Sequence, residues 1–150
     1  MAVTFIEYQN NKGFYIHEDF MQLAFFYIYE EMRKPNYQFS HKSDLLYDCE
    51  AIINGRRSSY LVLNWNDFLV NTPDVQLMIE LLENAVMFLQ KKGSYISVSE
   101  LQNMPTQDEH WLMIMDREFP VNELIKIFAA LIEMLHGKWT STNYDMKISW

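Results

Sequence analysis

Residues 71–93 read NTPDVQLMIELLENAVMFLQKKG and predict a long helix with a defined start and end. Thr72 is a suitable capping residue, Pro73 fits the first helical position, and the acid that follows complements the positive end of the helix dipole. Gly93 supplies the left-handed residue that commonly ends a helix. We therefore expect a helix from Thr72 to about Lys92.

The apolar residues of this helix cover more than one face. They form a stripe at three- and four-residue spacing, which further leucines and a phenylalanine widen. The set consists of Val75, Leu77, Met78, Ile79, Leu81, Leu82, Ala85, Val86, Phe88 and Leu89. We therefore expect this helix to be central and contacted on several sides.

Outward from this helix, three other amphipathic patterns predict helices at residues 17–33, 43–54 and 121–136. Ser43 is the expected cap of the second of these helices. Residues 60–70, YLVLNWNDFLV, leave helix and strand open, because the apolar spacing is helical while YLVL favours a strand. Helix is the favoured interpretation of this segment.

Two short motifs predict the starts of shorter helices. Ser97 with Glu100, and Thr106 with Glu109, both match the Ser/Thr-x-x-Glu capping box. In such a box the Ser or Thr side chain accepts a hydrogen bond from the backbone N–H of the Glu, and the Glu side chain accepts one from the backbone N–H of the Ser or Thr. We expect one short helix after each motif.

The two ends of the sequence carry the candidate β structure. Residues 3–16, VTFIEYQNNKGFYI, predict a short hairpin, because the turn-forming NNKG separates two β-prone runs. Residues 146–149, MKIS, are a candidate closing strand that pairs with the amino-terminal one. The predicted fold is mainly α: a multi-helix bundle in a single domain over residues 1–150, with a small β element from the two termini left open.

The charge balance is acidic, with twenty Asp and Glu against twelve Lys and Arg and a net charge of −8. This balance favours attraction to basic surfaces and disfavours binding to nucleic acid. Cys49 is the only cysteine, so an intramolecular disulfide is excluded and a reducing cytoplasm is the expected compartment. We expect neither secretion nor membrane spanning, because the sequence contains no signal-peptide pattern and no uncharged apolar run of about 18 residues.

Patterns that support catalysis are weak. Residues 17–19 (His-Glu-Asp) and 108–110 (Asp-Glu-His) contain metal-ligand types, but adjacent helical residues point in different directions and acids at helix starts complement the dipole. Cys49 falls on an apolar helix face, which is typical of a core thiol. Glycine-rich phosphate loops and paired-cysteine motifs are absent. We expect a non-enzyme without cofactor or metal, and a metal-dependent hydrolase is the third-ranked alternative.

The surplus acids suggest binding to a protein. Asp44 and Asp48 lie one helical turn apart and are expected to share an exposed face. A second set of acids flanks the aromatic Trp111 and consists of Asp108, Glu109, Asp116 and Glu118. Acids beside an exposed aromatic suit docking onto a basic protein, because charge speeds encounter and the ring supplies a lasting contact. The competing interpretation places Trp111 in the core and leaves the acids merely solvated.

The whole profile resembles the small bacterial immunity proteins of contact-dependent inhibition and other polymorphic toxin systems. The resemblance lies in one acidic, aromatic-rich domain without catalytic motifs and in the segments QKKGSYISVSEL (90–101), DEHWLMIMD (108–116) and NELIKIFAALIEMLHG (122–137). It implies a cognate toxin, often a basic nuclease, whose cleft is occluded by the acidic surface. The alternative is a helical adaptor or scaffold subunit of an oligomer, and the oligomeric state is left open.

Overall fold

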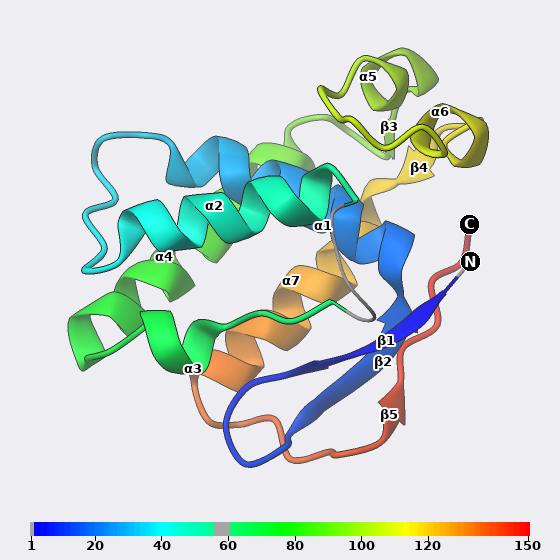
Figure 1. The fold of residues 1–150 in the computed structure, drawn as a ribbon. Helices are drawn as coiled ribbons and strands as arrows, with labels where there is room; N and C mark the ends of the chain where they lie inside the picture. Colours follow the sequence, from blue (N-terminus) through cyan, green and yellow to red (C-terminus); the bar gives the residue numbers. More distant parts are fainter. Residues whose placement is uncertain (1, 56–60) are drawn as a thin grey trace.

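The computed structural model describes residues 2–55 and 61–150 and is mainly helical, with two small sheets (Figure 1). The helices of this part of the chain are α1 (Glu18–Met32), α2 (Lys42–Ile53), α3 (Trp65–Phe68), α4 (Thr72–Gln90), α5 (Val98–Gln102), α6 (Trp111–Ile114) and α7 (Val121–Leu135). The strands are β1 (Val3–Glu7), β2 (Gly13–His17), β3 (Tyr95–Ile96), β4 (Phe119–Pro120) and β5 (Tyr144–Asp145).

Helices α1, α4 and α7 form the packed interior, and α2 lies on α1 (Figure 1). The prediction of a helix contacted on several sides is confirmed, because α4 packs against both α1 and α7. Most of its apolar stripe is buried, from Met78 to Leu89. Met87 and Phe88 remain about half exposed, so the stripe is not covered all round.

The start of α4 differs from the predicted one. Asn71, and not Thr72, is the capping residue, and its side chain accepts a hydrogen bond from the Asp74 backbone N–H at 2.9 Å. Asp74 is buried and accepts hydrogen bonds from Ser40 and Val70, so it holds the preceding loops as well as complementing the dipole. The predicted cap of α2 is also wrong, because that helix already begins at Lys42 and includes Ser43.

The predicted hairpin is confirmed. Strands β1 and β2 pair antiparallel, from Val3 opposite His17 to Glu7 opposite Gly13. The turn places Gln9, Asn10 and Asn11 at positive φ, a conformation that asparagine tolerates better than most residues. Gly13 has no room for a side chain, because a Cβ there would collide with the backbone of Ile6.

The carboxyl-terminal segment joins this sheet, but not as predicted. The strand is β5 rather than residues 146–149, and it pairs in parallel with β2, giving the order β1-β2-β5. Met146 follows it and donates its N–H to the Tyr15 carbonyl at 2.9 Å. A second, two-stranded sheet joins β3 to β4 and was not predicted.

The helix favoured for residues 60–70 is wrong over most of its length, and position 60 lies outside the described residues. Leu61, Leu63 and Trp65 are buried while Val62 is exposed, which is the alternation of an extended chain. Thr4 of β1 bonds both the N–H and the carbonyl of Leu61 through its hydroxyl group. Only the single turn α3 is helical, and tertiary contact with β1 has overridden the helical spacing.

One of the two predicted helix starts is confirmed, although the Glu100 side chain there accepts from Tyr27 and Lys92, and the other predicted start is wrong. Ser97 Oγ accepts a hydrogen bond from the Glu100 N–H at 3.1 Å and caps α5. Thr106 instead donates to the Ile53 carbonyl at 2.6 Å and accepts from the Asp108 N–H at 3.0 Å. The helix that follows Thr106 is the single turn α6, without a side-chain cap. Among the described residues, no helix is long and apolar enough to cross a membrane.

Candidate protein-binding surfaces and cleft

The outer face of α2 brings together an exposed aromatic ring and two acids. Asp44 is exposed and lies 3.4 Å from His41 Nδ1, and Asp48 follows one turn later. Between them in the sequence, Tyr47 is 65% exposed, which makes it one of the most exposed large hydrophobic side chains among the described residues. The sequence reasoning missed Tyr47, although its position three residues after Asp44 places it on the same helical face.

Asp48 also has a structural role at this surface. Its carboxylate accepts a hydrogen bond from Asn64 Nδ2 at 3.0 Å, which ties α2 to the segment before α3. Partial burial raises the pKa of Asp48, the Asn64 bond opposes this shift, and the nearby charge of Asp44 adds to it. We define the α2 face as Asp44, Tyr47 and Asp48.

Trp111 is a core residue and not the exposed anchor of the predicted docking surface. It is 2% exposed, and its indole N–H donates to the Leu101 carbonyl at 2.7 Å. A one-turn helix turns this side chain inward and its neighbours outward. Leu112 and Met113 are 56% and 74% exposed, so they are the apolar side chains presented beside the acids here.

The four acids around Trp111 differ in environment. Asp108 is half-buried and accepts hydrogen bonds from Gln22 Nε2 at 3.1 Å and from the His110 N–H at 3.0 Å, so it anchors its loop to α1. Glu109, Asp116 and Glu118 are exposed. Asp116 is paired with the neighbouring Arg117 at 3.0 Å. Of these four acids, Asp108 is the one whose side chain joins two elements of the fold, and the other three are displayed on the surface.

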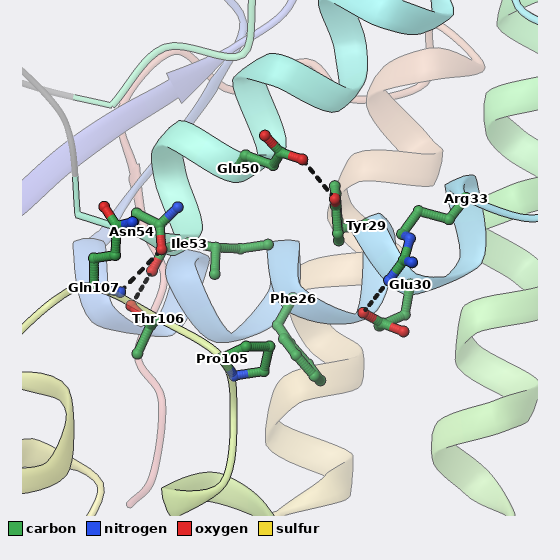
Figure 2. Close-up of a pocket in the computed structure, with 10 residues that line it drawn as sticks. All are labelled: Phe26, Tyr29, Glu30, Arg33, Glu50, Ile53, Asn54, Pro105, Thr106 and Gln107. Carbon is green, nitrogen blue, oxygen red and sulfur yellow. Dashed lines mark hydrogen bonds and ion pairs between the residues drawn. The ribbon is translucent and has the colours of Figure 1, made fainter.

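A cleft of about 510 Å³ lies between α1, the end of α2 and the loop at 105–107 (Figure 2). We name it the α1–α2 cleft. Its lining consists of Phe26, Tyr29, Glu30, Arg33, Glu50, Ile53, Asn54, Pro105, Thr106 and Gln107. The loop is fixed to α2 by two bonds, from Thr106 to the Ile53 carbonyl at 2.6 Å and from the Gln107 N–H to Asn54 Oδ1 at 2.9 Å.

Two carboxylates and one guanidinium group face this cleft (Figure 2). Glu50 accepts a hydrogen bond from the Tyr29 hydroxyl at 2.6 Å, and this bond, followed by burial, raises the pKa of Tyr29. Glu30 lies 3.5 Å from Arg33, whose guanidinium carbon is 5.5 Å from the centre of the Tyr29 ring. The Glu30–Arg33 pair has the i,i+3 spacing of neighbours on one helix, whereas the bond between Tyr29 and Glu50 has no spacing signal because these residues come from different helices.

The side chains that line the cleft are acidic, amide, hydroxyl, guanidinium and apolar. Its lining includes no histidine or cysteine, and no group of three or more His, Cys, Asp or Glu side chains is placed to hold a metal ion within residues 2–55 and 61–150. Cys49 lies in the core, where burial raises the pKa of its thiol well above the ordinary value. What the arrangement offers is hydrogen-bond acceptors and negative charge beside apolar and aromatic surface.

Comparison with known proteins identifies no relative: no protein-family model, curated protein or solved structure matches this chain.

Proposed function

We propose that this chain is a non-catalytic protein-binding protein, of the immunity-protein kind, that neutralises a basic toxin domain such as a nuclease by steric and electrostatic occlusion. The observation that carries the proposal is the α2 face, where Tyr47 stands exposed between Asp44 and Asp48. An aromatic anchor flanked by acids combines the contact area of a binding hot spot with long-range attraction to a basic partner.

The surface around α6 supports the same function. Leu112 and Met113 are exposed beside Glu109, Asp116 and Glu118, so apolar area is again surrounded by negative charge. Trp111 contributes by holding α6 in place from the core and not by touching the partner. The proposed compartment is the cytoplasm, which fits a chain whose single cysteine is a buried free thiol.

The test measures binding to the protein encoded next to this chain, at low and at high salt. We expect binding at low salt that weakens as salt rises, because the attraction is between charges. The double variant Asp44→Lys/Asp48→Asn keeps an acceptor for the Asn64 amide and should lower affinity about tenfold or more. A control with the same charge change, Glu7→Lys/Glu133→Gln, alters exposed acids away from both surfaces and should have a smaller effect.

A second double variant, Glu109→Lys/Asp116→Lys, examines the α6 surface. It leaves Asp108 intact, because replacing that anchor of the loop would perturb the fold. Undiminished binding by both double variants rejects both surfaces. No affinity of the unaltered chain for its neighbour at low salt rejects the proposed function.

One observation favours the second candidate function, a helical adaptor or scaffold subunit. A groove of about 510 Å³ runs between α4 and α7, with Met87, Ile125 and Ile132 among its apolar residues and Glu80 and Glu83 among its lining acids. Such a groove suits an amphipathic helix of another chain. Sedimentation velocity at low and high protein concentration tests the version with a like chain, in which Met87→Glu should abolish self-association. A monomer at all concentrations contradicts that version.

A further inference from the structure

We infer that the α1–α2 cleft binds the side chain of an arginine carried by the basic partner. The inference rests on the proposed function and names the chemistry by which the partner is held. Glu50 is a half-buried carboxylate that faces the cleft. Within the described chain, Glu50 forms no ion pair, and its hydrogen-bond partner is the neutral hydroxyl of Tyr29. A half-buried carboxylate whose partner in the described ranges is a neutral hydroxyl can gain a charge-assisted hydrogen bond from a positively charged ligand.

The other charged groups of the cleft provide no cation for Glu50. Glu30 and Arg33 neutralise one another at 3.5 Å, so the lining carries one carboxylate in excess. Both side chains of that pair are about half exposed, and such pairs are held weakly. Because this pair is weak, the Arg33 side chain can move away from an incoming guanidinium group. An anionic ligand would face repulsion from Glu50 and is excluded on the same ground.

The shape of the cleft fits an arginine in particular. Phe26, Ile53 and Pro105 supply apolar surface along which the three methylene groups of the side chain can lie. The Tyr29 ring already has the guanidinium group of Arg33 5.5 Å from its centre, so an aromatic contact with a planar cation exists at this cleft. A planar guanidinium group beside Glu50 could donate two parallel, charge-assisted hydrogen bonds to the carboxylate. An ammonium group lacks this paired geometry and would bind less well.

Two donors at the far side of the cleft are already occupied. The Thr106 hydroxyl donates to the Ile53 carbonyl, and the Gln107 backbone N–H donates to Asn54 Oδ1. These bonds fix the loop that forms this wall, and the ion pair of the proposed contact is assigned to Glu50. The proposed contact is therefore one ion pair between the guanidinium group and Glu50, beside the apolar side chains of the cleft.

The test uses the full chain and the peptide acetyl-Gly-Arg-Gly-amide, followed by NMR titration. We expect saturable shifts at Phe26, Tyr29 and Ile53, with no binding of the peptide in which neutral citrulline replaces arginine. Glu50→Gln retains an acceptor for the Tyr29 hydroxyl and should weaken the arginine peptide about tenfold. Glu7→Gln removes the same charge from an exposed position of β1, outside both the cleft and the α4–α7 groove, and serves as the matched control, expected to bind as the unaltered chain does.

Three results overturn the inference: no saturable binding of the arginine peptide, equal binding of the citrulline peptide, or equal binding by the Glu50→Gln variant. Equal affinity for a lysine peptide overturns the assignment to a guanidinium group. These results are independent of the neighbouring protein, so they separate a failure of the cleft from a failure of the proposed function. If the chain binds the arginine peptide but not the protein encoded next to it, the assignment of the cleft stands and the proposed toxin partner is rejected.

Discussion

At the scale of single residues, Asp74 shows how one buried carboxylate joins separate parts of the chain. Its Oδ1 accepts from the Ser40 N–H at 3.1 Å and from the Ser40 hydroxyl at 3.2 Å, and its Oδ2 accepts from the Val70 N–H at 3.3 Å. Asp74→Asn removes the charge and one acceptor position. We expect the free energy of unfolding to fall by about 1–3 kcal/mol in urea denaturation.

The control for this prediction is Asp44→Asn, which makes the same chemical change on the exposed face of α2. We expect it to change the free energy of unfolding by less than about 0.5 kcal/mol. Equal losses for the two variants would show that the bonds of Asp74 do not stabilise the fold. The result matters for function, because the loops that Asp74 fixes lead into α2 and α4.

Cys49 carries a prediction about pH. Burial, and then the charges of Asp48 and Glu50, raise the pKa of its thiol far above the value in an unfolded chain. We expect no reaction with Ellman's reagent until the protein unfolds. Because the folded thiol keeps its proton while the unfolded one ionises, stability should fall as pH rises from about 8.5 to 10. Cys49→Ala should flatten that slope, and rapid labelling of the native chain would contradict the prediction.

The residues of the candidate surfaces show what sequence can and cannot place. Spacing within one helix is sufficient to group Asp44 and Asp48, and the same rule would have added Tyr47. It does not tell which way Trp111 faces, because α6 is one turn long and its packing is set by the Leu101 carbonyl. The pairing of Glu50 with another helix has no local sequence signal at all.

At the scale of elements, the long helices were predictable, whereas of the short helices in the described ranges the sequence placed the start of α5 alone. The apolar period of α1, α4 and α7 continues for at least 15 residues, so local pattern and tertiary burial agree. In residues 61–70 they disagree, because contact with β1 holds Leu61 extended and Asn64 adopts a left-handed conformation. The two-residue strands β3, β4 and β5 are set by pairing across the fold, which a single sequence does not reveal.

The last segment of the chain is held to α7 by Glu123, and this contact gives a second pH prediction. The carboxylate accepts from Lys126 Nζ at 2.8 Å and from the Ser149 N–H at 2.7 Å, and these two bonds lower its pKa. A lowered pKa stabilises the fold above the unfolded value of about 4.3, and this contribution is lost as pH falls through the folded value. We expect amide exchange at Ser149 to accelerate on acidification relative to its intrinsic rate.

Glu123→Gln should reproduce this loosening at neutral pH, because a neutral amide binds Lys126 and the Ser149 N–H less strongly. Hydrogen exchange followed by NMR provides the measurement. Glu133→Gln, an exposed change on the same helix, is the control and should leave Ser149 protected. Unchanged exchange in Glu123→Gln would mean that Trp150, whose indole N–H donates to the Glu118 carbonyl at 2.9 Å, holds the segment without help.

At the scale of the whole molecule, one apolar core connects both proposed binding surfaces. The cluster of buried side chains includes members from every helix in the described ranges, among them Leu45 of α2 and Trp111 of α6. The α2 face and the α6 surface therefore have rigid support from the same interior. Rigid support favours a binding surface, because less conformational freedom is lost when the partner docks.

A single connected core predicts that residues 1–150 unfold as one cooperative unit. Far-ultraviolet circular dichroism reports the helices, and fluorescence reports tryptophans that include Trp65 on α3 and Trp111 on α6. At neutral pH, where the Glu123 contact is intact, we expect the two denaturation curves to coincide. Two separated transitions would contradict the single-domain prediction, and they would divide the α2 face from the α6 surface. The partner would then have to bind across two independently unfolding parts.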